Sequence, residues 1–246
     1  MPELEGKVAL VTGGSRGIGA AIATRLATAG ADVAVTYREA EARAAGVIAE
    51  IEALGRRAVA LRADSADASE VTGAVDRTAR ELGGLDILVN NAGIFPAKPF
   101  EEFTVDEIDY ALDVHARAAF LAAQAAVAHM TGGGRIVNIG TNLSEHAPFG
   151  GLTLYNLSKS ALNGFTKALA RELGPRDITV NLVQPGSTDT EMNPADGDHA
   201  RDQERLTALG CFGRADDVAA AVAFLAGESG RSITGAFLTV DGGTNA

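Results

Sequence analysis

A tyrosine and a lysine four residues apart carry the strongest chemical signal in the sequence. Tyr155-Asn156-Leu157-Ser158-Lys159 opens a segment, 155–173, whose apolar spacing predicts a helix. Residues i and i+4 lie on one face of a helix, so the phenol and the ammonium would project the same way. A free tyrosine has a pKa of about 10, and a neighbouring lysine cation favours the phenolate. The pair therefore predicts general acid/base catalysis, here of a hydride transfer.

A glycine-rich segment near the start of the chain predicts a site for a dinucleotide. Thr12-Gly13-Gly14-Ser15-Arg16-Gly17-Ile18-Gly19 has the spacing G-x-x-x-G-x-G. Glycines allow a tight turn whose backbone N–H groups approach a pyrophosphate closely, and the N-terminus of the following helix attracts the anion. A glycine turn by itself is weak evidence of such a site. Its place between the apolar run 7–12 and the alanine-rich segment 18–29 strengthens the prediction.

The residues after the second apolar run, 32–36, indicate which of two cofactors, NAD(H) or NADP(H), would bind. An NAD site expects an acidic residue there to accept hydrogen bonds from the ribose 2′-OH. The run instead ends in Tyr37-Arg38, and Arg16 could join Arg38 around a 2′-phosphate. Glu39 is the one acid near enough to favour NAD(H), and Arg38 could also be a solvated surface charge. The pattern favours NADP(H) over NAD(H).

The elements that must position these residues alternate along the chain. Short apolar runs bounded by Gly, Asp or Asn predict buried strands at 7–12, 32–36, 57–61, 85–89, 135–139, 178–183 and 236–240. Helical patterns lie between them at 18–29, 39–54, 67–82, 104–129, 155–173 and 216–226. Asp67 and Thr104 each precede a Glu at the third helical position, which predicts two N-caps. The alternation predicts a single α/β domain over residues 1–246: a doubly wound (Rossmann) parallel seven-stranded sheet with helices on both faces.

Composition excludes several classes of function. The chain has 246 residues, 46% of them hydrophobic, and a net charge of −11, so a nucleic-acid partner is not expected. No apolar stretch approaches the roughly 20 residues that span a bilayer, and the run at 7–12 lacks the basic residues of a signal peptide. Cys211 is the only cysteine, which fits a cytoplasmic protein. The four histidines and Cys211 show no metal-ligand spacing, so no metal site is expected.

The sequence resembles the short-chain dehydrogenase/reductase family over nearly its whole length. The motifs that carry the resemblance are TGGSRGIG at 12–19, Asp64 after the third strand, NNAG at 90–93, RIVNIG at 135–140, YNLSK at 155–159, NLVQPG at 181–186 and TGAFLTVDGG at 234–243. The chain looks most like the 3-oxoacyl-[acyl-carrier-protein] reductase-like members, which are typically NADPH-dependent tetramers. The resemblance thus implies NADP(H)-dependent interconversion of a ketone, such as a 3-oxoacyl thioester, with a secondary alcohol. It also implies a homotetramer or a homodimer.

The resemblance implies a role for each matching position. Tyr155 would protonate the substrate oxygen as hydride arrives from the nicotinamide, and Lys159 would lower the tyrosine pKa and bind the ribose. The other cofactor contacts would be Gly13, Ser15, Arg16, Gly17, Ile18 and Gly19 at the pyrophosphate, Arg38 at the adenosine phosphate, Asp64 and Ser65 at the adenine, Asn91, Ala92 and Gly93 at the adenosine ribose, and Pro185, Gly186, Thr188 and Thr190 at the nicotinamide.

Two positions depart from the family pattern. The family usually has a serine about 13 or 14 residues before the tyrosine, where this chain has Thr141 and Asn142. Thr141 matches best and keeps a hydroxyl that could orient a carbonyl, and Asn142 could donate from its amide instead. His115 stands where the family commonly has an asparagine that kinks the helix and holds a water near the lysine. A neutral imidazole could continue such a proton relay, or the histidine could be satisfied by a backbone carbonyl.

The polar segment 187–210 breaks the alternation of strands and helices, and we expect it to be a mobile lid over the nicotinamide. Two other functions remain open at this point. One is a dinucleotide-binding protein with a decayed active site, which the two departures would mark. The other is an epimerase or dehydratase on the same fold.

Overall fold

Seven parallel strands form one sheet in the computed structural model, which describes residues 3–246. Their order across the sheet is β3-β2-β1-β4-β5-β6-β9, and every neighbouring pair is parallel. The predicted fold class is therefore confirmed, with each of the seven strands at its predicted place. The strands are β1 (Val8–Val11), β2 (Asp32–Tyr37), β3 (Ala58–Arg62), β4 (Ile87–Asn90), β5 (Gly134–Ile139), β6 (Ile178–Pro185) and β9 (Phe237–Val240).

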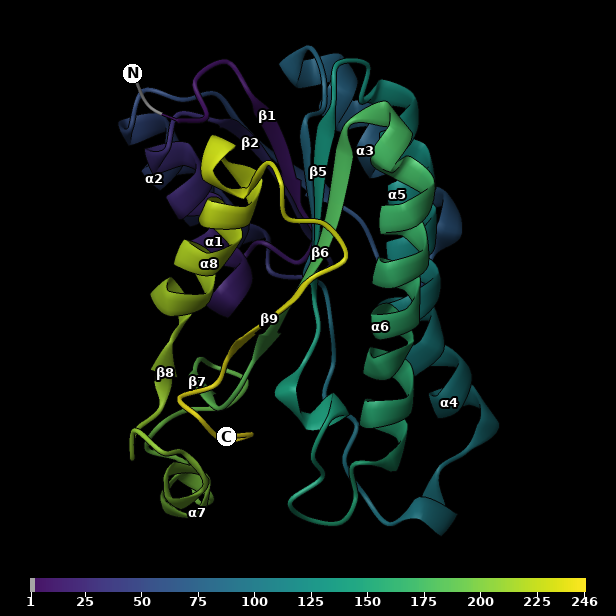
Figure 1. The fold of residues 1–246 in the computed structure, drawn as a ribbon, viewed down its shortest axis with the longest axis vertical. Coiled ribbons are helices and arrows are strands. Elements are labelled where there is room, and N and C mark those ends of the chain that lie inside the picture. Colours follow the sequence, from purple (N-terminus) through teal and green to yellow (C-terminus); the bar gives the residue numbers. More distant parts are fainter. Residues whose placement is uncertain (1–2) are drawn as a thin grey trace.

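Helices cover both faces of the sheet (Figure 1). One face carries α1 (Gly17–Thr28), α2 (Glu41–Ala53) and α8 (Ala215–Ala226), and the other carries α3 (Ala68–Leu82), α5 (Ala118–His129) and α6 (Thr153–Leu173), with α4 (Val105–Leu112) beside α6. Successive strand residues point to opposite faces, so each strand feeds two cores. In β1, Val11 packs with Ile22 of α1, whereas Leu10 packs in the core that contains Ala122 of α5.

The strand order reverses between β1 and β4, because the chain winds outward from β1 in one direction and from β4 in the other. In doubly wound folds a ligand crevice forms beyond the carboxyl ends of the strands at this reversal. The segments that follow β1, β4, β5 and β6 meet at this edge, and they contain the glycine turn and the residues chosen from the sequence as catalytic.

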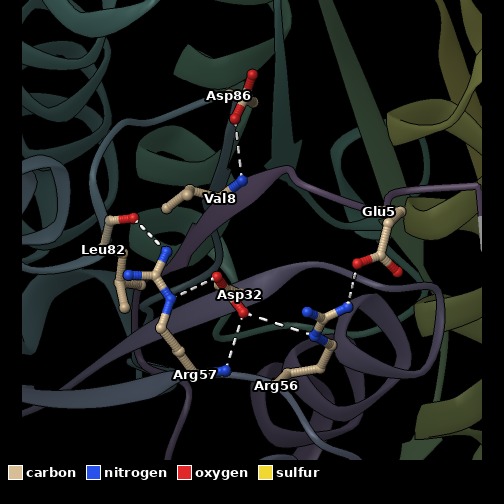
Figure 2. Close-up of polar contacts among 7 residues, drawn as sticks. All are labelled: Glu5, Val8, Asp32, Arg56, Arg57, Leu82 and Asp86. Atoms are coloured by element: carbon tan, nitrogen blue, oxygen red, sulfur yellow. Dashed lines mark hydrogen bonds and ion pairs between the residues drawn. The ribbon is translucent and has the colours of Figure 1, made fainter.

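The opposite edge of the sheet is held by charged side chains that take no part in that crevice (Figure 2). Asp32 at the start of β2 accepts hydrogen bonds from both the backbone N–H and the Nε of Arg57, each at 2.8 Å. Arg56 joins Glu5 at 2.8 Å, and the carboxylate of Asp86 accepts the backbone N–H of Val8 at 2.9 Å. These contacts fix the amino ends of β1, β2, β3 and β4 relative to one another.

The two helix N-caps foreseen in the sequence are present, but they differ in detail. Thr104 and Glu107 form a reciprocal capping box at the start of α4. Asp67 caps α3 by accepting the backbone N–H groups of Ser69 and Glu70. The Glu70 carboxylate turns away from the cap and accepts the backbone N–H of Asp64 at 2.7 Å, so this cap is one-sided.

Two regions differ from the elements predicted from the sequence. The helix expected over 104–129 is interrupted by a π-helical segment, Asp113–Arg117, between α4 and α5. The segment expected as a lid without secondary structure contains the strand β7 (Thr188–Asp189) and the short helix α7 (Ala200–Leu206). β7 pairs with β8 (Gly213–Arg214) in a separate two-stranded sheet. Neither feature has a repeating apolar pattern in the sequence that would reveal it.

Candidate active site

The glycine turn after β1 is a tight cradle that has no space for side chains. A Cβ on Gly19 would lie 2.3 Å from the backbone oxygen of Gly13, and a Cβ on Gly13 would lie 2.9 Å from the Cα of Ala92. Gly13 and Gly17 also have positive φ angles of 64° and 51°, which favour glycine. The turn is therefore specified by its backbone, and it keeps main-chain groups accessible for a close ligand.

The N-terminus of α1 opens into this cradle without a cap of its own. The N-cap residue Arg16 makes no side-chain capping bond, and the first turn of α1 has no acidic residue. The amide of Asn91 donates to the backbone oxygens of Thr12 and Gly13, at 2.8 and 3.1 Å, and so ties the turn to β4. Free N–H groups at a helix N-terminus attract an anion, so this end of α1 fits a pyrophosphate.

Arg38 lies at the end of β2, where the adenosine phosphate was expected. It is exposed and pairs with Glu39 at 3.1 Å, and it also donates to the hydroxyl of Tyr110 from α4. Arg16 is exposed as well, and neither guanidinium is buried against the fold. Both cations of the predicted phosphate site are therefore accessible. Asp64 and Ser65 follow β3 at the same edge of the sheet, as expected from the sequence.

Tyr155 lies in the first turn of α6 and remains partly exposed to solvent. The ring of Phe95 packs edge-on against it, with the ring centres 4.7 Å apart. Burial of the phenol raises the pKa of Tyr155, and the hydroxyl of Thr141 opposes this shift as a hydrogen-bond partner. The direction is opposite to the acidification by Lys159 expected from the sequence, because burial is the larger cause and outweighs the hydrogen bond with Thr141.

Lys159 lies one helical turn below Tyr155 and is buried. Its Nζ donates to the backbone oxygen of Ile139 at 2.9 Å, at the end of β5. A Cβ on Gly93 would lie 3.2 Å from this Nζ, so the glycine allows the lysine to approach the segment after β4. Burial lowers the pKa of Lys159 to about 8, which brings its protonation equilibrium near the physiological range.

The structure separates the two residues proposed for the place of the family serine. Thr141 is buried beside Tyr155, and its Oγ1 also accepts the backbone N–H of Leu143 at 3.2 Å. The amide of Asn142 donates instead to Asp241 at 3.4 Å. Thr141 thus caps the short turn that follows β5 and still presents its hydroxyl to the tyrosine, whereas the Asn142 amide is engaged elsewhere.

His115 projects from the π-helical segment into the same region. The backbone N–H of Ile94 donates to its Nε2 at 3.0 Å, and its Nδ1 lies 2.8 Å from the hydroxyl of Ser158. Burial, followed by the charge of Lys159, lowers the pKa of His115 to about 2, so the ring is neutral. Both ring nitrogens have protein partners, but these are a backbone N–H and a serine hydroxyl and not the backbone carbonyl expected from the sequence.

The residues expected at the nicotinamide end follow β6 in one stretch. Thr188 is buried and donates to the backbone oxygen of Gly186 at 3.0 Å. A Cβ on Gly186 would lie 2.6 Å from the Cβ of Asp241, so this position also requires glycine. Thr190 reaches the glycine turn, because its Cγ2 lies 3.3 Å from a Cβ placed on Gly17. Pro185 closes β6 just before this stretch.

The chain is similar to known proteins over almost its whole length. Residues 13–245 match the family model described as Enoyl-(Acyl carrier protein) reductase. An uncharacterized oxidoreductase of Methylorubrum extorquens is 40% identical over 247 residues, covering 99% of each chain. The chain belongs to the short-chain dehydrogenase/reductase family. It is therefore related to oxidoreductases along its whole length.

Two solved structures of the family are very similar to this one. A short-chain dehydrogenase from Burkholderia cenocepacia J2315, in complex with NADP, is 60% identical, with a TM-score of 0.98 over 99% of this chain and 100% of that one. A blue fluorescent protein from a metagenomic library, in complex with NADPH, is 53% identical, with a TM-score of 0.97 over 99% of this chain and 100% of that one. NADP and NADPH are thus the cofactors bound in these two relatives.

Sequence reasoning missed three residues that belong to this site. Ser158 lies inside the motif that contains Tyr155, but only its contact with His115 reveals a role. Tyr110 touches Arg38 from a distant helix, and Glu191 pairs with Arg43 of α2 at 3.6 Å. Such contacts join segments far apart in the chain and leave no local pattern.

Among residues 3–246, no helix is long and apolar enough to cross a membrane, and no group of His, Cys, Asp and Glu could hold a metal.

Proposed function

We propose that this protein is an NADP(H)-dependent oxidoreductase that transfers a hydride between the nicotinamide and a ketone or secondary alcohol. The observation that carries the proposal is the position of Tyr155, with Thr141 beside it and Lys159 one turn below, at the strand edge that also carries the glycine cradle. A proton donor and a dinucleotide cradle are the two parts that such a reaction requires. Their joint presence favours an enzyme over a decayed binding protein.

The residues present fit an NADP(H) molecule. The cradle at Gly13 and Gly19 and the uncapped N-terminus of α1 suit the pyrophosphate, and the exposed Arg16 and Arg38 suit the additional phosphate. The complexes of the two relatives with NADP and NADPH support this choice. The bound cofactor would supply the hydride. The segment 187–210, which the sequence suggests as a lid, would cover the nicotinamide end through Thr188 and Thr190.

The protein's own groups handle the proton. A raised pKa keeps Tyr155 protonated, which is the form that donates to a carbonyl oxygen during reduction. The hydroxyl of Thr141 would orient that oxygen, and Lys159 would stabilise the phenolate left after the proton has moved. Since the Lys159 pKa is about 8, the lysine is still largely protonated near neutral pH and can supply this charge.

Exposed apolar side chains support an apolar ketone as the substrate. Phe95, Phe149 and Met192 expose 45%, 48% and 52% of their surface, and Phe95 packs directly on the ring of Tyr155. The Phe95 ring beside the proton donor, which we propose Phe149 and Met192 extend into an apolar wall, would bind an acyl chain or a small hydrophobic ketone. We propose 3-oxoacyl thioesters as the first class to test. Because the matching family model is described as an enoyl reductase, an enoyl thioester is the comparison substrate.

The test measures consumption of NADPH with acetoacetyl-CoA, crotonyl-CoA and a panel of simple ketones. We expect turnover with ketones, little with crotonyl-CoA, and a large loss of kcat in Tyr155→Phe. Binding of NADPH, followed through its fluorescence, should be unchanged in the same variant, which separates lost chemistry from lost folding. Full turnover by Tyr155→Phe would overturn the proposed role of the phenol. A product with an inverted centre or an added double bond would indicate an epimerase or dehydratase.

We also propose that the chain assembles as a homotetramer or homodimer in the cytoplasm. Phe120 of α5 and Leu157 of α6 expose 54% and 57% of their surface, and Phe120 stacks on Phe165 with the ring centres 5.6 Å apart. Exposed apolar faces on neighbouring helices support an interface between subunits. Light scattering after size-exclusion chromatography would measure the mass, and a monomer at micromolar concentration would contradict this part of the proposal.

A further inference from the structure

His115 occupies an unusual stretch of backbone. The segment Asp113–Arg117 is π-helical, and π-helical turns are rare and occur mostly as single wide turns near functional sites. The wide turn places the His115 ring, which is only 2% exposed, between the segment after β4 and the start of α6. The ring centre lies 6.0 Å from that of Tyr155, almost at a right angle to it.

The hydrogen bonds of this ring determine where its proton lies. A backbone N–H can only donate, so the Nε2 that receives the N–H of Ile94 at 3.0 Å carries no proton. A neutral imidazole must then carry its proton on Nδ1, which donates to the Oγ of Ser158 at 2.8 Å. The Ser158 hydroxyl donates in turn to the backbone oxygen of Leu154 at 2.9 Å, with the backbone oxygen of Tyr155 at 3.1 Å as a second acceptor. Every donor in this chain of bonds therefore has an acceptor, and the chain ends on a helix backbone.

The two segments that the ring connects carry different parts of the candidate site. Ile94 is followed by Phe95, whose ring forms the wall against Tyr155. Ser158 lies between Tyr155 and Lys159 on α6. The segment after β4 is held by Thr12 at Ala92 and by Gly151 at Lys98, and His115 supplies the hydrogen bond between these two points, at Ile94. The ring therefore fixes the backbone directly next to Phe95.

We infer that His115 is a positioning residue: its neutral ring links the Ile94 backbone to Ser158, holds Phe95 against Tyr155, and transfers no proton. The inference rests on the proposed function, since it concerns the wall beside the proposed proton donor. The titratable side chains that face the ring are Lys159 and Tyr155. The pKa of His115, lowered by burial and then by the charge of Lys159, agrees with a ring that stays neutral.

The first test observes the ring directly and requires no turnover. Long-range ¹H–¹⁵N spectra of the labelled protein distinguish the two neutral tautomers and the charged form of each histidine. His115 is assigned by the loss of its signals in a His115→Gln variant. We expect the form protonated on Nδ1, unchanged between about pH 5 and 8, where ordinary histidines titrate. A ring protonated on Nε2, or one that titrates in this range, would overturn the inference whatever the activity of the protein.

The second test uses two variants that each keep one of the bonds. The amide oxygen of His115→Gln can accept the Ile94 N–H, whereas the shorter side chain of His115→Asn can reach only Ser158. We expect His115→Gln to keep the KM for the ketone and slow hydrogen exchange at Ile94. His115→Asn should raise that KM about tenfold, the effect of one lost hydrogen bond, and speed exchange at Ile94.

A proton relay predicts a different pattern, because neither amide titrates. If both variants lost kcat equally and shifted the pH profile with KM unchanged, His115 would be part of the chemistry and the positioning role would be wrong. Absence of any turnover in the wild-type protein would remove the proposed function. The tautomer and the exchange rate at Ile94 would still be measurable in that case, so the two failures are distinguishable.

Discussion

Replacing Gly19 by alanine tests whether the glycine cradle binds the cofactor. The new Cβ would lie 2.3 Å from the backbone oxygen of Gly13, about 1 Å inside ordinary contact, and 2.5 Å from the Nδ2 of Asn91. The amide of Asn91 can turn, but the Gly13 oxygen belongs to the backbone, so the turn itself must move. Gly19 lies in the first turn of α1, where alanine favours the helix by about 1 kcal/mol. Overpacking costs about 1–3 kcal/mol, so the variant should lose at most about 2 kcal/mol of folding stability.

The effect on cofactor binding should be measurable in the folded variant. A displacement of about 1 Å at the atoms that hold a reactant can cost on the order of 100-fold in function. We therefore expect the NADPH Kd, measured by fluorescence titration, to rise about 100-fold in Gly19→Ala. The matched control is Gly46→Ala in α2, where a Cβ meets nothing within 4 Å. It should raise the melting temperature and leave the Kd unchanged. Equal NADPH affinity in the two variants would refute the assignment of the cradle.

Three further predictions follow from single contacts. Lys159→Met should abolish turnover yet stabilise the fold at neutral pH, because burial lowers the lysine pKa from 10.5 to about 8. That lowering corresponds to about 3.4 kcal/mol, and the lost bond to the Ile139 oxygen offsets about 1 kcal/mol of it, which leaves a gain of about 2 kcal/mol. The unfolded chain binds the lysine proton more tightly than the folded protein does, so the free energy of unfolding of the wild type rises between pH 8 and 10.5. Urea unfolding should therefore show that the extra stability of the variant decreases over this pH range. Arg38→Ser should weaken NADPH binding about 10- to 100-fold and leave NADH binding unchanged; equal losses for both would exclude a phosphate contact. Asp32→Asn should cost about 1.5–3 kcal/mol of stability with kcat retained, since Asp32 anchors Arg57 at the edge remote from the crevice.

The sheet and its place in the chain could be predicted because buried parallel strands leave a local signature. Each apolar run is short, is bounded by turn residues and alternates with a helical pattern, so the seven strands follow from neighbouring residues alone. The glycine turn was predictable for the same reason, since one strand, one turn and one helix contain it. Membership of the family was foreseen from motifs in order along the chain, and the comparisons confirm it.

Contacts between distant segments could not be predicted from local patterns. The sequence left Thr141 and Asn142 as alternatives, and only the contact with Asp241, 99 residues further along the chain, shows where the Asn142 amide points. The direction of the Tyr155 pKa shift depends on burial, which no spacing of residues reveals. The helix α7 has no periodic apolar face in the sequence, because it covers only seven residues at the surface. The roles of the individual site residues remain predictions for the experiments above.

The wide turn at Asp113–Arg117 also accommodates one residue more than a regular helical turn would hold. A π-helical hydrogen bond spans five residues where an α-helical one spans four, so the widened turn absorbs the extra residue and leaves the flanking helices nearly in register. Ala111 therefore stays fully buried, and Tyr110 still reaches Arg38. A single-residue deletion here would restore a regular helix and spare α4 and α5, but it would remove the turn from which His115 reaches Ile94 and Ser158.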